Sequence, residues 1–288
     1  MRVTRYTDVA AFAARAEPYL IQHEAEHNLS LGLLSNLLHT QTYPTYLLAL
    51  VEDGEGDAAE VVMTVIQTPP HNPVLSLVAP QADASAVMAA LADDLRSDHT
   101  TLPGVTGSNA LALFFAEAWQ ARSSQTFHVS KHERIYRLTT VKPVTGVAGT
   151  MRRATEADRA LLMDWLAAFG RETFGDEKPT DATAITNTML TSPQRAAYLW
   201  EDKGRVVSLA AYGGPTPNGI RVGPVYTPPE ERGKGYASAC VAALSQMLLD
   251  GGRRFCFLFT DLANPTANHI YQSIGYEAVS DVDMYLFG

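Results

Sequence analysis

The sequence has little cysteine, and its first residues form no long apolar run. Both cysteines, Cys240 and Cys256, lie inside apolar stretches, which favours buried, reduced thiols over a disulfide framework or a zinc cluster. We therefore expect no metal. Residues 1–20 carry scattered charges, so they predict neither a signal peptide nor a membrane span. We expect a cytoplasmic protein.

The chain also lacks a surplus of positive charge. Lysine and arginine number 22 against 31 acidic residues, which gives a formal net charge of -9. Because nucleic acids and anionic membranes repel an acidic surface, we expect neither as a partner. Hydrophobic residues make up 46% of 288 residues. This is an ordinary globular composition with enough apolar material for two domains.

The two halves of the chain show a similar plan, with a boundary near residue 145. Each half opens on a strand-like segment followed by a helix-like one, at residues 2–20 and 150–169. In the second case Thr155 is a plausible N-cap with Asp158 three residues later. Each half closes on an alternating strand pattern, at 132–141 and 283–288. Residues 141–150 are small and glycine-bearing and indicate a linker.

The elements inside the two halves come in a similar order. The first half predicts a hairpin over 45–68, a strand over 72–79 and helices over 85–97 and 109–122. The second half predicts a hairpin over 196–213, strands over 220–227 and 253–261, helices over 236–250 and 264–275, and a final strand or pair over 276–287. The helix over 236–250 has an apolar stripe at intervals of three and four residues, so we expect it to be buried.

A glycine- and cation-bearing loop connects the strand at 220–227 to that helix. Pro228 and Pro229 cannot donate to a sheet ladder and end the strand. The run Arg232-Gly233-Lys234-Gly235 then meets the helix N-terminus, where unpaired backbone N–H groups and the helix dipole favour an anion such as pyrophosphate. A Walker nucleotide loop is excluded because Pro228 occupies the position of the motif's first glycine. A GxGxxG fingerprint is excluded because Ser238 occupies the position of its third glycine.

The loop and a segment downstream carry a family resemblance. Arg232, Gly235 and Ala237 form an Arg-x-x-Gly-x-Ala pattern between a strand and a helix. The downstream segment supplies Asn264, Asn268, Tyr271 and the pair Gly275-Tyr276. Together they resemble the GNAT superfamily of N-acetyltransferases. The resemblance implies an α/β (α+β) protein with two GNAT-like domains, each a mixed, mostly antiparallel twisted sheet flanked by helices.

The resemblance also implies which residues act. Residues 145–288 would be the catalytic domain, using acetyl-CoA as co-substrate, and Val225 would direct its N–H at the thioester carbonyl. Tyr271 would be the general acid, and Glu172 a base or amine-binding group, although a chain of waters could replace it. The cofactor-binding residues would be Val225, Tyr226, Thr227, Arg232, Gly233, Lys234, Gly235, Tyr236, Ala237, Ser238, Asn264 and Asn268. Trp165, Phe169 and Phe174 could line the acceptor pocket, with core packing favoured for the first two.

The first half, residues 1–144, lacks these features. It has no glycine between Gly56 and Gly104 and no tyrosine between Tyr46 and Tyr136, so the anion loop and the general acid are both missing. We expect a degenerate GNAT-like copy that shapes the acceptor pocket or a subunit contact. Its polar cluster His23–Asn28 could resemble a metal site, but a solvated helix face is the better interpretation.

Several alternatives stay open at this level. A non-catalytic acyl-CoA-binding sensor or scaffold would keep the same loop, although the retained Tyr271 favours an enzyme. A different acyl donor is a weaker possibility. The amine acceptor is unspecified and could be a polyamine, an antibiotic, an amino acid or a protein N-terminus, because no general code relates acceptor loops to substrates. A homodimer is also possible.

Overall fold

The chain divides into two units that do not correspond to a single cut in the sequence. The computed structural model describes residues 1–40, 43–54, 56, 59–98, 101–175 and 180–288. Unit 1 comprises Met1–Tyr136, Phe259–Asn264 and Ala278–Gly288, and unit 2 comprises Arg137–Leu258 and Pro265–Glu277. The functional division at residue 145 stays a prediction.

Unit 1 is a mostly antiparallel sheet with helices on both faces. Its strand order is β1-β2-β3-β4-β5-β12-β6, in which β4 and β5 pair in parallel. The strands are β1 (Arg2–Tyr6), β2 (Leu47–Asp53), β3 (Glu60–Gln67), β4 (Val74–Leu75), β5 (Gly104–Ser108), β6 (Phe127–Leu138) and β12 (Glu277–Phe287). The helices are α1 (Val9–Leu20), the short η1 (Ile21–His23), α2 (Asn28–His39), α3 (Ala84–Asp98) and α4 (Asn109–Gln120).

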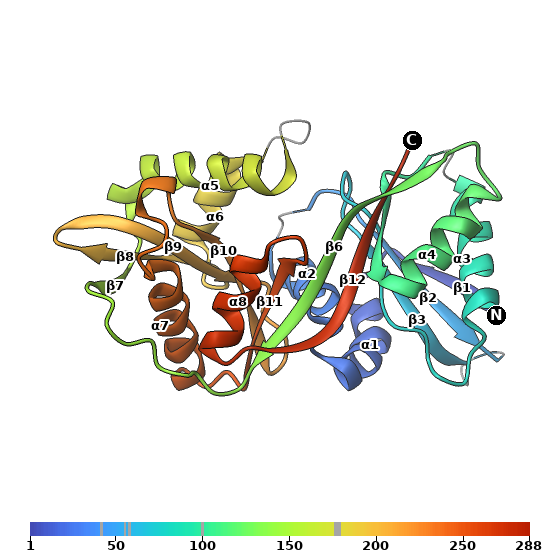
Figure 1. Cartoon of the computed structure of the whole chain (residues 1–288). Helices are drawn as coiled ribbons and strands as arrows, with labels where there is room; N and C mark the ends of the chain where they lie inside the picture. Colours follow the sequence, from blue (N-terminus) through green and yellow to red (C-terminus); the bar gives the residue numbers. More distant parts are fainter. Residues whose placement is uncertain (41–42, 55, 57–58, 99–100, 176–179) are drawn as a thin grey trace. The chain divides into compact units, whose positions relative to one another are not determined.

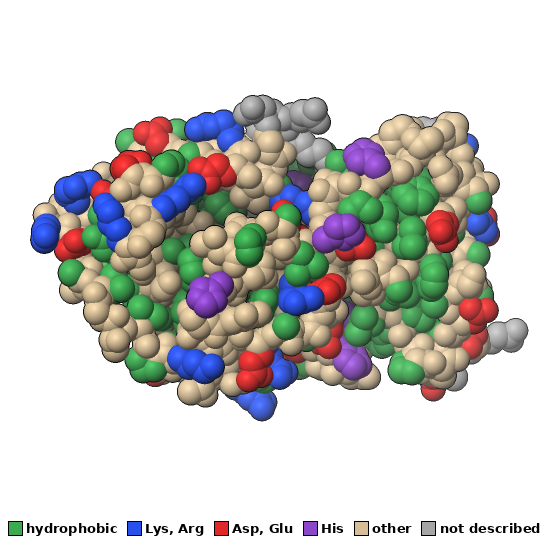
Figure 2. Space-filling model, in the orientation of Figure 1, with side chains coloured by type: hydrophobic (Ala, Val, Ile, Leu, Met, Phe, Trp, Pro, Cys, Tyr) green, Lys and Arg blue, Asp and Glu red, His purple; other side chains and the backbone are tan. Residues whose placement is uncertain are grey.

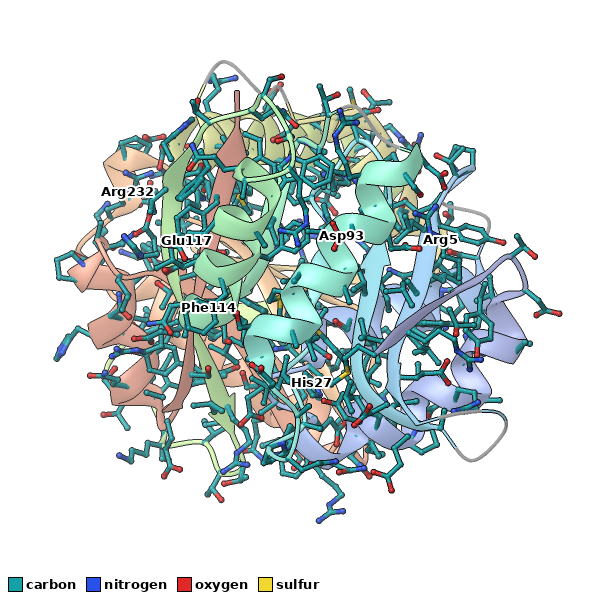
Figure 3. All side chains as sticks on the ribbon, turned by 90° about the vertical axis from the view of Figure 1, so that its right-hand side faces the viewer. Arg5, His27, Asp93, Phe114, Glu117 and Arg232 are labelled. Carbon is teal, nitrogen blue, oxygen red and sulfur yellow. The ribbon has the colours of Figure 1, made fainter. Side chains whose placement is uncertain are left out.

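The alternation of side chains along β2 builds one core on each face of this sheet. Leu48 and Leu50 pack with α1 and α2, whereas Ala49 and Val51 pack with α3 and α4. Successive strand residues point to opposite faces, so a strand that is apolar at every position must be covered twice. Figure 3 shows α3 and α4 side by side, with Asp93 on the former and Phe114 on the latter.

The C-terminal strand β12 lies in unit 1, between β5 and β6. Residues Val282–Leu286 pair with Gly104–Ser108, and Tyr285 enters the core beside α3 and α4. A Cβ on Gly104 would lie 2.1 Å from the carbonyl oxygen of Tyr285, so glycine permits this close approach. We expected residues 283–288 to form the last strand of the second half. This expectation is wrong, because the strand pairs with β5 in unit 1.

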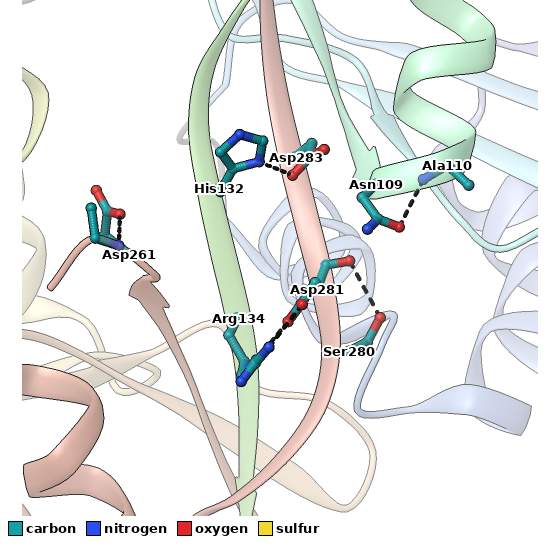
Figure 4. Close-up of polar contacts among 9 residues, drawn as sticks. Asn109, Ala110, His132, Arg134, Asp261, Ser280, Asp281 and Asp283 are labelled. Carbon is teal, nitrogen blue, oxygen red and sulfur yellow. Dashed lines mark hydrogen bonds and ion pairs between the residues drawn. The ribbon is translucent and has the colours of Figure 1, made fainter. Parts of the chain in front are cut away.

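Polar and charged side chains join β12 to β6, its neighbour on the other side. Arg134 donates two hydrogen bonds to Asp281, at 2.6 and 2.9 Å, and His132 Nδ1 lies 2.7 Å from Asp283 (Figure 4). The fork from Arg134 lowers the pKa of Asp281. The position of β12 is thus supported by the buried Tyr285 ring on one side and by these side-chain contacts with β6 on the other.

The strands of unit 2 also pair mostly in the antiparallel direction. Their order is β7-β8-β9-β10-β11, in which β10 and β11 pair in parallel. The strands are β7 (Thr150–Arg153), β8 (Ala196–Asp202), β9 (Arg205–Gly213), β10 (Gly219–Tyr226) and β11 (Phe255–Asp261). The helical elements are η3 (Glu156–Asp158), α5 (Arg159–Phe174), α6 (Ala182–Thr191), η4 (Pro229–Glu231), α7 (Tyr236–Asp250) and α8 (Pro265–Ile274). Figure 1 shows α5 and α6 on one face of β8–β10 and α7 on the other.

Most of the expected elements are confirmed. The structure contains the buried helix over 236–250, both hairpins and the capping box of Thr155 and Asp158. The sequence pattern missed β5, because its five residues include two glycines and show no alternation, and it missed α6. The predicted strand over 72–79 pairs with β5 only at Val74. The fold class, mixed α/β with mostly antiparallel sheets, is as expected.

The interpretation of His23–Asn28 as a solvated helix face is wrong. His27 is 3% exposed and Asn28 is fully buried. Among the residues that the structure describes, no group of three or more His, Cys, Asp or Glu side chains is arranged to hold a metal ion. No helix in the described part of the chain is long and apolar enough to cross a bilayer.

We predict that Tyr285→Ala destabilises unit 1 by about 3 kcal/mol, because truncating a buried aromatic ring leaves a cavity in a packed core. Tyr285→Phe is the control. It keeps the ring, which packs edge-on against Phe127 with the ring centroids 5.5 Å apart. This substitution should change stability little. Urea denaturation measures both. Equal stability of the alanine variant and the wild type would contradict the placement of β12.

Candidate functional site

The end of β10 is separated from its parallel neighbour. β10 pairs with β11 only from Gly219 to Arg221, while its antiparallel pairing with β9 continues to Tyr226 after a register shift between Val222 and Val225. Among the described residues, the β11-facing edge of the strand beyond Arg221 therefore has no ladder partner. An unpaired strand edge can accept an extended ligand chain as if it were another strand.

The loop after β10 leaves the start of α7 without a side-chain cap. Gly233 has φ +76° and Gly235 has φ +81°, and Gly235 is the N-cap in the left-handed region. The first helical bond runs from Ala239 N–H to the Gly235 carbonyl, and no side chain of the described residues caps the first turn. The amides of Tyr236, Ala237 and Ser238 therefore point outward at the positive end of the helix dipole.

Both cations of the loop are already paired with carboxylates. Lys234 Nζ donates to Glu231 at 2.8 Å, and Arg205 also pairs with this buried carboxylate. Arg232 pairs with Glu172. Hydrogen bonding from Lys234 lowers the pKa of Glu231, so the acid stays ionised. Glu231 is thus shared by two cations, and the backbone amides at the start of α7 add further positive potential at this site.

Arg232 is fixed at the end of β10 by three contacts. Its Nε donates to the Thr227 carbonyl at 2.8 Å, and its Nη2 lies 2.8 Å from both carboxylate oxygens of Glu172 on α5. Its guanidinium also lies over the Tyr226 ring, 5.8 Å from the centroid. Tyr226 in turn packs against Trp165, with ring centroids 5.8 Å apart. An ion pair therefore connects Glu172, the candidate base, to Arg232, a candidate cofactor-binding residue.

Tyr271 lies on α8, which packs against α7. Burial raises the pKa of Tyr271 to about 12, so its hydroxyl stays protonated at neutral pH. Its ring packs edge-on against Tyr276, whose hydroxyl lies 2.8 Å from Ser245 Oγ. Within the described part of the chain, no hydrogen bond engages the Tyr271 hydroxyl.

The other predicted residues lie in several elements. Asn268 lies on α8, whereas Asn264 lies in the segment Phe259–Asn264 that belongs to unit 1. Trp165 and Phe169 pack on the unit 2 core, as expected, and Phe174 is 48% exposed. Cys240 and Cys256 are buried, and burial raises the pKa of each thiol to about 12, which leaves no thiolate nucleophile at these positions.

A separate pocket of about 820 Å³ lies in unit 1, next to the point where β4 and β5 part. It is lined by Tyr19, the segment Leu77–Ala82 and the start of α4, among others. Next to this pocket, side chains form hydrogen bonds with the backbone N–H and C=O of Leu77. His27 Nε2 accepts the Leu77 N–H at 2.9 Å, and the Tyr19 hydroxyl lies 2.7 Å from the Leu77 carbonyl.

The protonation of His27 is set by its two neighbours. Nδ1 lies 2.8 Å from the Leu20 carbonyl and must donate, so Nε2 is free to accept. Burial lowers the pKa of His27, which favours this neutral form. Sequence reasoning missed this arrangement, because nothing in the His23–Asn28 pattern relates it to a strand end 50 residues away.

Comparison with known proteins matches part of the chain to a protein family. Residues 159–276 match the model of the acetyltransferase (GNAT) family. No curated protein matches the chain.

Solved structures match almost the whole chain at low identity. A structural-genomics protein from Drosophila has a TM-score of 0.69 at 13% identity, covering 99% of this chain and 98% of its own. A GNAT-family acetyltransferase from Colwellia psychrerythraea has a TM-score of 0.58 at 14% identity, with 100% of each chain covered. A tandem GNAT protein from the clavulanic acid biosynthesis pathway has 0.58 at 13%, covering 100% and 98%. These likenesses concern the fold.

Gly233 and Gly235 offer a matched test of the loop. Alanine at either position must adopt a left-handed φ, which costs about 1 kcal/mol. A Cβ on Gly235 would also lie 2.9 Å from Val147 Cγ2, whereas one on Gly233 meets nothing within 4 Å. We predict that Gly235→Ala lowers the free energy of unfolding more than Gly233→Ala, as measured by urea denaturation. The reverse order would show that the loop is built differently.

Proposed function

We propose an activity from the match of residues 159–276 to the GNAT family of acetyltransferases, which are acyltransferases. In this proposal the protein moves an acetyl group from acetyl-CoA to a primary amine, by direct transfer in a ternary complex. In this proposal residues 145–288 are the catalytic domain and residues 1–144 a copy without catalysis. A cytoplasmic location and a homodimer stay predictions from the sequence.

The uncapped start of α7 is the observation that carries the proposal. Gly235 as a left-handed N-cap, with Gly233 open to space, leaves the N–H groups of the first turn for an anion. A diphosphate suits such a site because it carries several acceptor oxygens and negative charge. The residues that would hold it are Gly233, Lys234, Gly235, Tyr236, Ala237 and Ser238, and the pantetheine arm would lie beside Val225, Tyr226 and Thr227 on the unpaired edge of β10.

The pairing of the loop cations refines this proposal. Because Arg232 and Lys234 are held by Glu172 and Glu231, we assign the diphosphate mainly to the backbone amides. Arg232 would then serve the acyl end of the site rather than the diphosphate end. Asn264, which precedes α8, and Asn268, which lies on it, are proposed to contact the cofactor.

The chemistry needs a proton acceptor and a proton donor. Acetyl-CoA supplies a thioester whose carbonyl carbon is attacked by the amine nitrogen, so that a C–N bond forms and the C–S bond breaks. The Val225 N–H would stabilise the developing oxyanion. Glu172 would take the proton from the amine, and Tyr271 would give its proton to the departing thiolate. The protonated state of the Tyr271 hydroxyl supports the second role.

A non-catalytic acyl-CoA sensor or scaffold is the competing function. It would bind the same cofactor through the same loop, so cofactor binding alone does not distinguish the two. Release of free thiol from acetyl-CoA in the presence of an amine panel does. Binding without thiol release for every amine would favour the sensor and reject the enzyme.

We predict that acetyl-CoA binds with a stoichiometry of one per chain in isothermal titration calorimetry. Among the described residues, only unit 2 has an uncapped helix start behind a glycine loop, whereas in unit 1 the Leu77 backbone is bonded by His27 and Tyr19. Two sites per chain would contradict the assignment of residues 1–144 as a degenerate copy, and no binding would reject the proposed function.

We predict that Tyr271→Phe lowers kcat by roughly 10²–10⁴-fold, the usual range for a general acid. Tyr276→Phe is the matched control, because it removes the neighbouring hydroxyl and its contact with Ser245. The control should lose about 1 kcal/mol of stability and little turnover. Thiol release at saturating substrates measures both. Unchanged turnover in Tyr271→Phe would remove this residue from the mechanism.

A further inference from the structure

The Glu172–Arg232 ion pair leaves hydrogen-bonding capacity on both partners. Nε of Arg232 donates to Thr227, and Nη2 faces both oxygens of Glu172. In the described part of the chain nothing binds Nη1, which carries two further N–H donors. Each carboxylate oxygen of Glu172 also has lone-pair sites to spare. A small molecule can therefore bind across the intact pair, with an anion on Arg232 and a cation on Glu172.

Both partners are accessible, and the guanidinium is held in place. The side chains of Glu172 and Arg232 are each 47% exposed. An exposed pair contributes little stability by itself, so a built arrangement needs further support. Here the Thr227 carbonyl and the Tyr226 ring fix the guanidinium independently of Glu172. The two N–H groups of Nη1 are thus held in place for a carboxylate.

Among the described residues, the charges that act on the neighbouring Tyr226 hydroxyl are balanced. Glu172 and Glu230 oppose Arg171 and Arg232 there. Figure 2 likewise shows acidic and basic side chains intermingled over the part of the surface that unit 2 forms. A polyamine or aminoglycoside carries several positive charges and would need a surplus of acids here. A molecule with one positive and one negative charge matches a balanced site.

The pair also lies close to the proposed reacting centre. Arg232 is bonded to Thr227, which lies two residues beyond Val225 and hence about 7 Å along an extended strand. A molecule seated on the pair therefore has its amine within reach of a thioester polarised by the Val225 N–H.

We propose that the acceptor is an α-amino acid, whose carboxylate is bound by Nη1 of Arg232 and whose amine is bound by Glu172. This inference rests on the proposed function and names its substrate class. Nη2 of the same guanidinium lies 2.8 Å from the Glu172 carboxylate, so the two charges of the ligand must also be close, as they are when both are attached to one carbon. A peptide N-terminus has the amine but not the adjacent carboxylate.

The transfer step is balanced within this arrangement. The ammonium passes one proton to the Glu172 carboxylate, which releases it to solvent, and the neutral nitrogen attacks the acetyl carbon. As the C–S bond breaks, the nitrogen gives its second proton to Glu172, and Tyr271 gives its proton to the thiolate. Glu172 then loses its proton and Tyr271 regains one through solvent. The products are an N-acetyl amino acid and coenzyme A, with no oxidant or reductant required.

The experiment compares amino acids with the same amines lacking the carboxylate. Acetyl-CoA is the donor, thiol release is the readout, and the pairs are L-phenylalanine with 2-phenylethylamine, L-lysine with cadaverine, and L-alanine with ethylamine. Spermidine is the polyamine probe. For at least one pair we expect kcat/KM to be about 10- to 100-fold higher for the amino acid, the usual contribution of a charge-assisted hydrogen bond. Equal values in all pairs, or a preference for spermidine, would overturn the proposal and leave the acetyltransferase function intact.

Two arginine variants show whether the preference comes from this pair. Arg232→Gln removes the carboxylate ligand, so the amino-acid-to-amine ratio should fall to about one. Arg171→Gln is the matched control, because it removes the same charge one residue from Glu172 without an ion pair to it. The control should keep the ratio. An equal loss in both variants would mean that net charge, not the Arg232 fork, selects the acceptor, and would reject the proposal.

Direct binding separates this inference from the proposed function. Saturation-transfer NMR in the presence of coenzyme A should detect L-phenylalanine bound to wild type and to Arg171→Gln, but not to Arg232→Gln. If thiol release is absent with every amine, the acetyltransferase function fails, and amino-acid binding by NMR still supports the ligand class. Absence of both thiol release and amino-acid binding rejects both statements.

Discussion

The proposed activity depends on a helix start that has no cap of its own. A helix begins with N–H groups that lack intrahelical partners, and most helices satisfy them with a Ser, Thr, Asp or Asn side chain. In α7 the cap is Gly235, which has no side chain to offer. The helix is held instead by its apolar face, which includes Cys240, Val241 and Leu244 in the core. Burial of that face thus keeps an uncapped terminus in place for an anion.

Both units contain a pair of parallel strands that separates, but the segment that follows the strand differs between them. In each, a parallel strand pair parts, at β4 and β5 in unit 1 and at β10 and β11 in unit 2. In unit 1 the backbone beyond that point is bonded by the neutral His27 and by Tyr19, next to a pocket of about 820 Å³. In unit 2 the strand instead leads into the glycine loop. In our proposal the segment that follows the strand, rather than the opening of the sheet alone, decides which ligand each unit accepts.

Electrostatics divides the site in unit 2 into two ends. At the start of α7, the pairing of Lys234 with Glu231 leaves the backbone dipoles to meet an anion. At the end of β10, the pairing of Arg232 with Glu172 forms a balanced charge pair beside two aromatic rings. Separating the two ends in this way suits a reaction that joins a polyanionic donor to a small zwitterion.

The sequence by itself determined the elements whose signals are local. The strand ending at Pro228, the glycine loop, the apolar stripe of α7 and the downstream asparagine–tyrosine segment all lie within short windows, and they sufficed to predict the fold class and the family. Only the tertiary structure decided which distant groups meet. The partners of Arg232 and His27 lie 60 and 50 residues away, and β12 joins β5 across more than half of the chain. Such contacts arise from packing and charge pairing between elements, which no local pattern encodes.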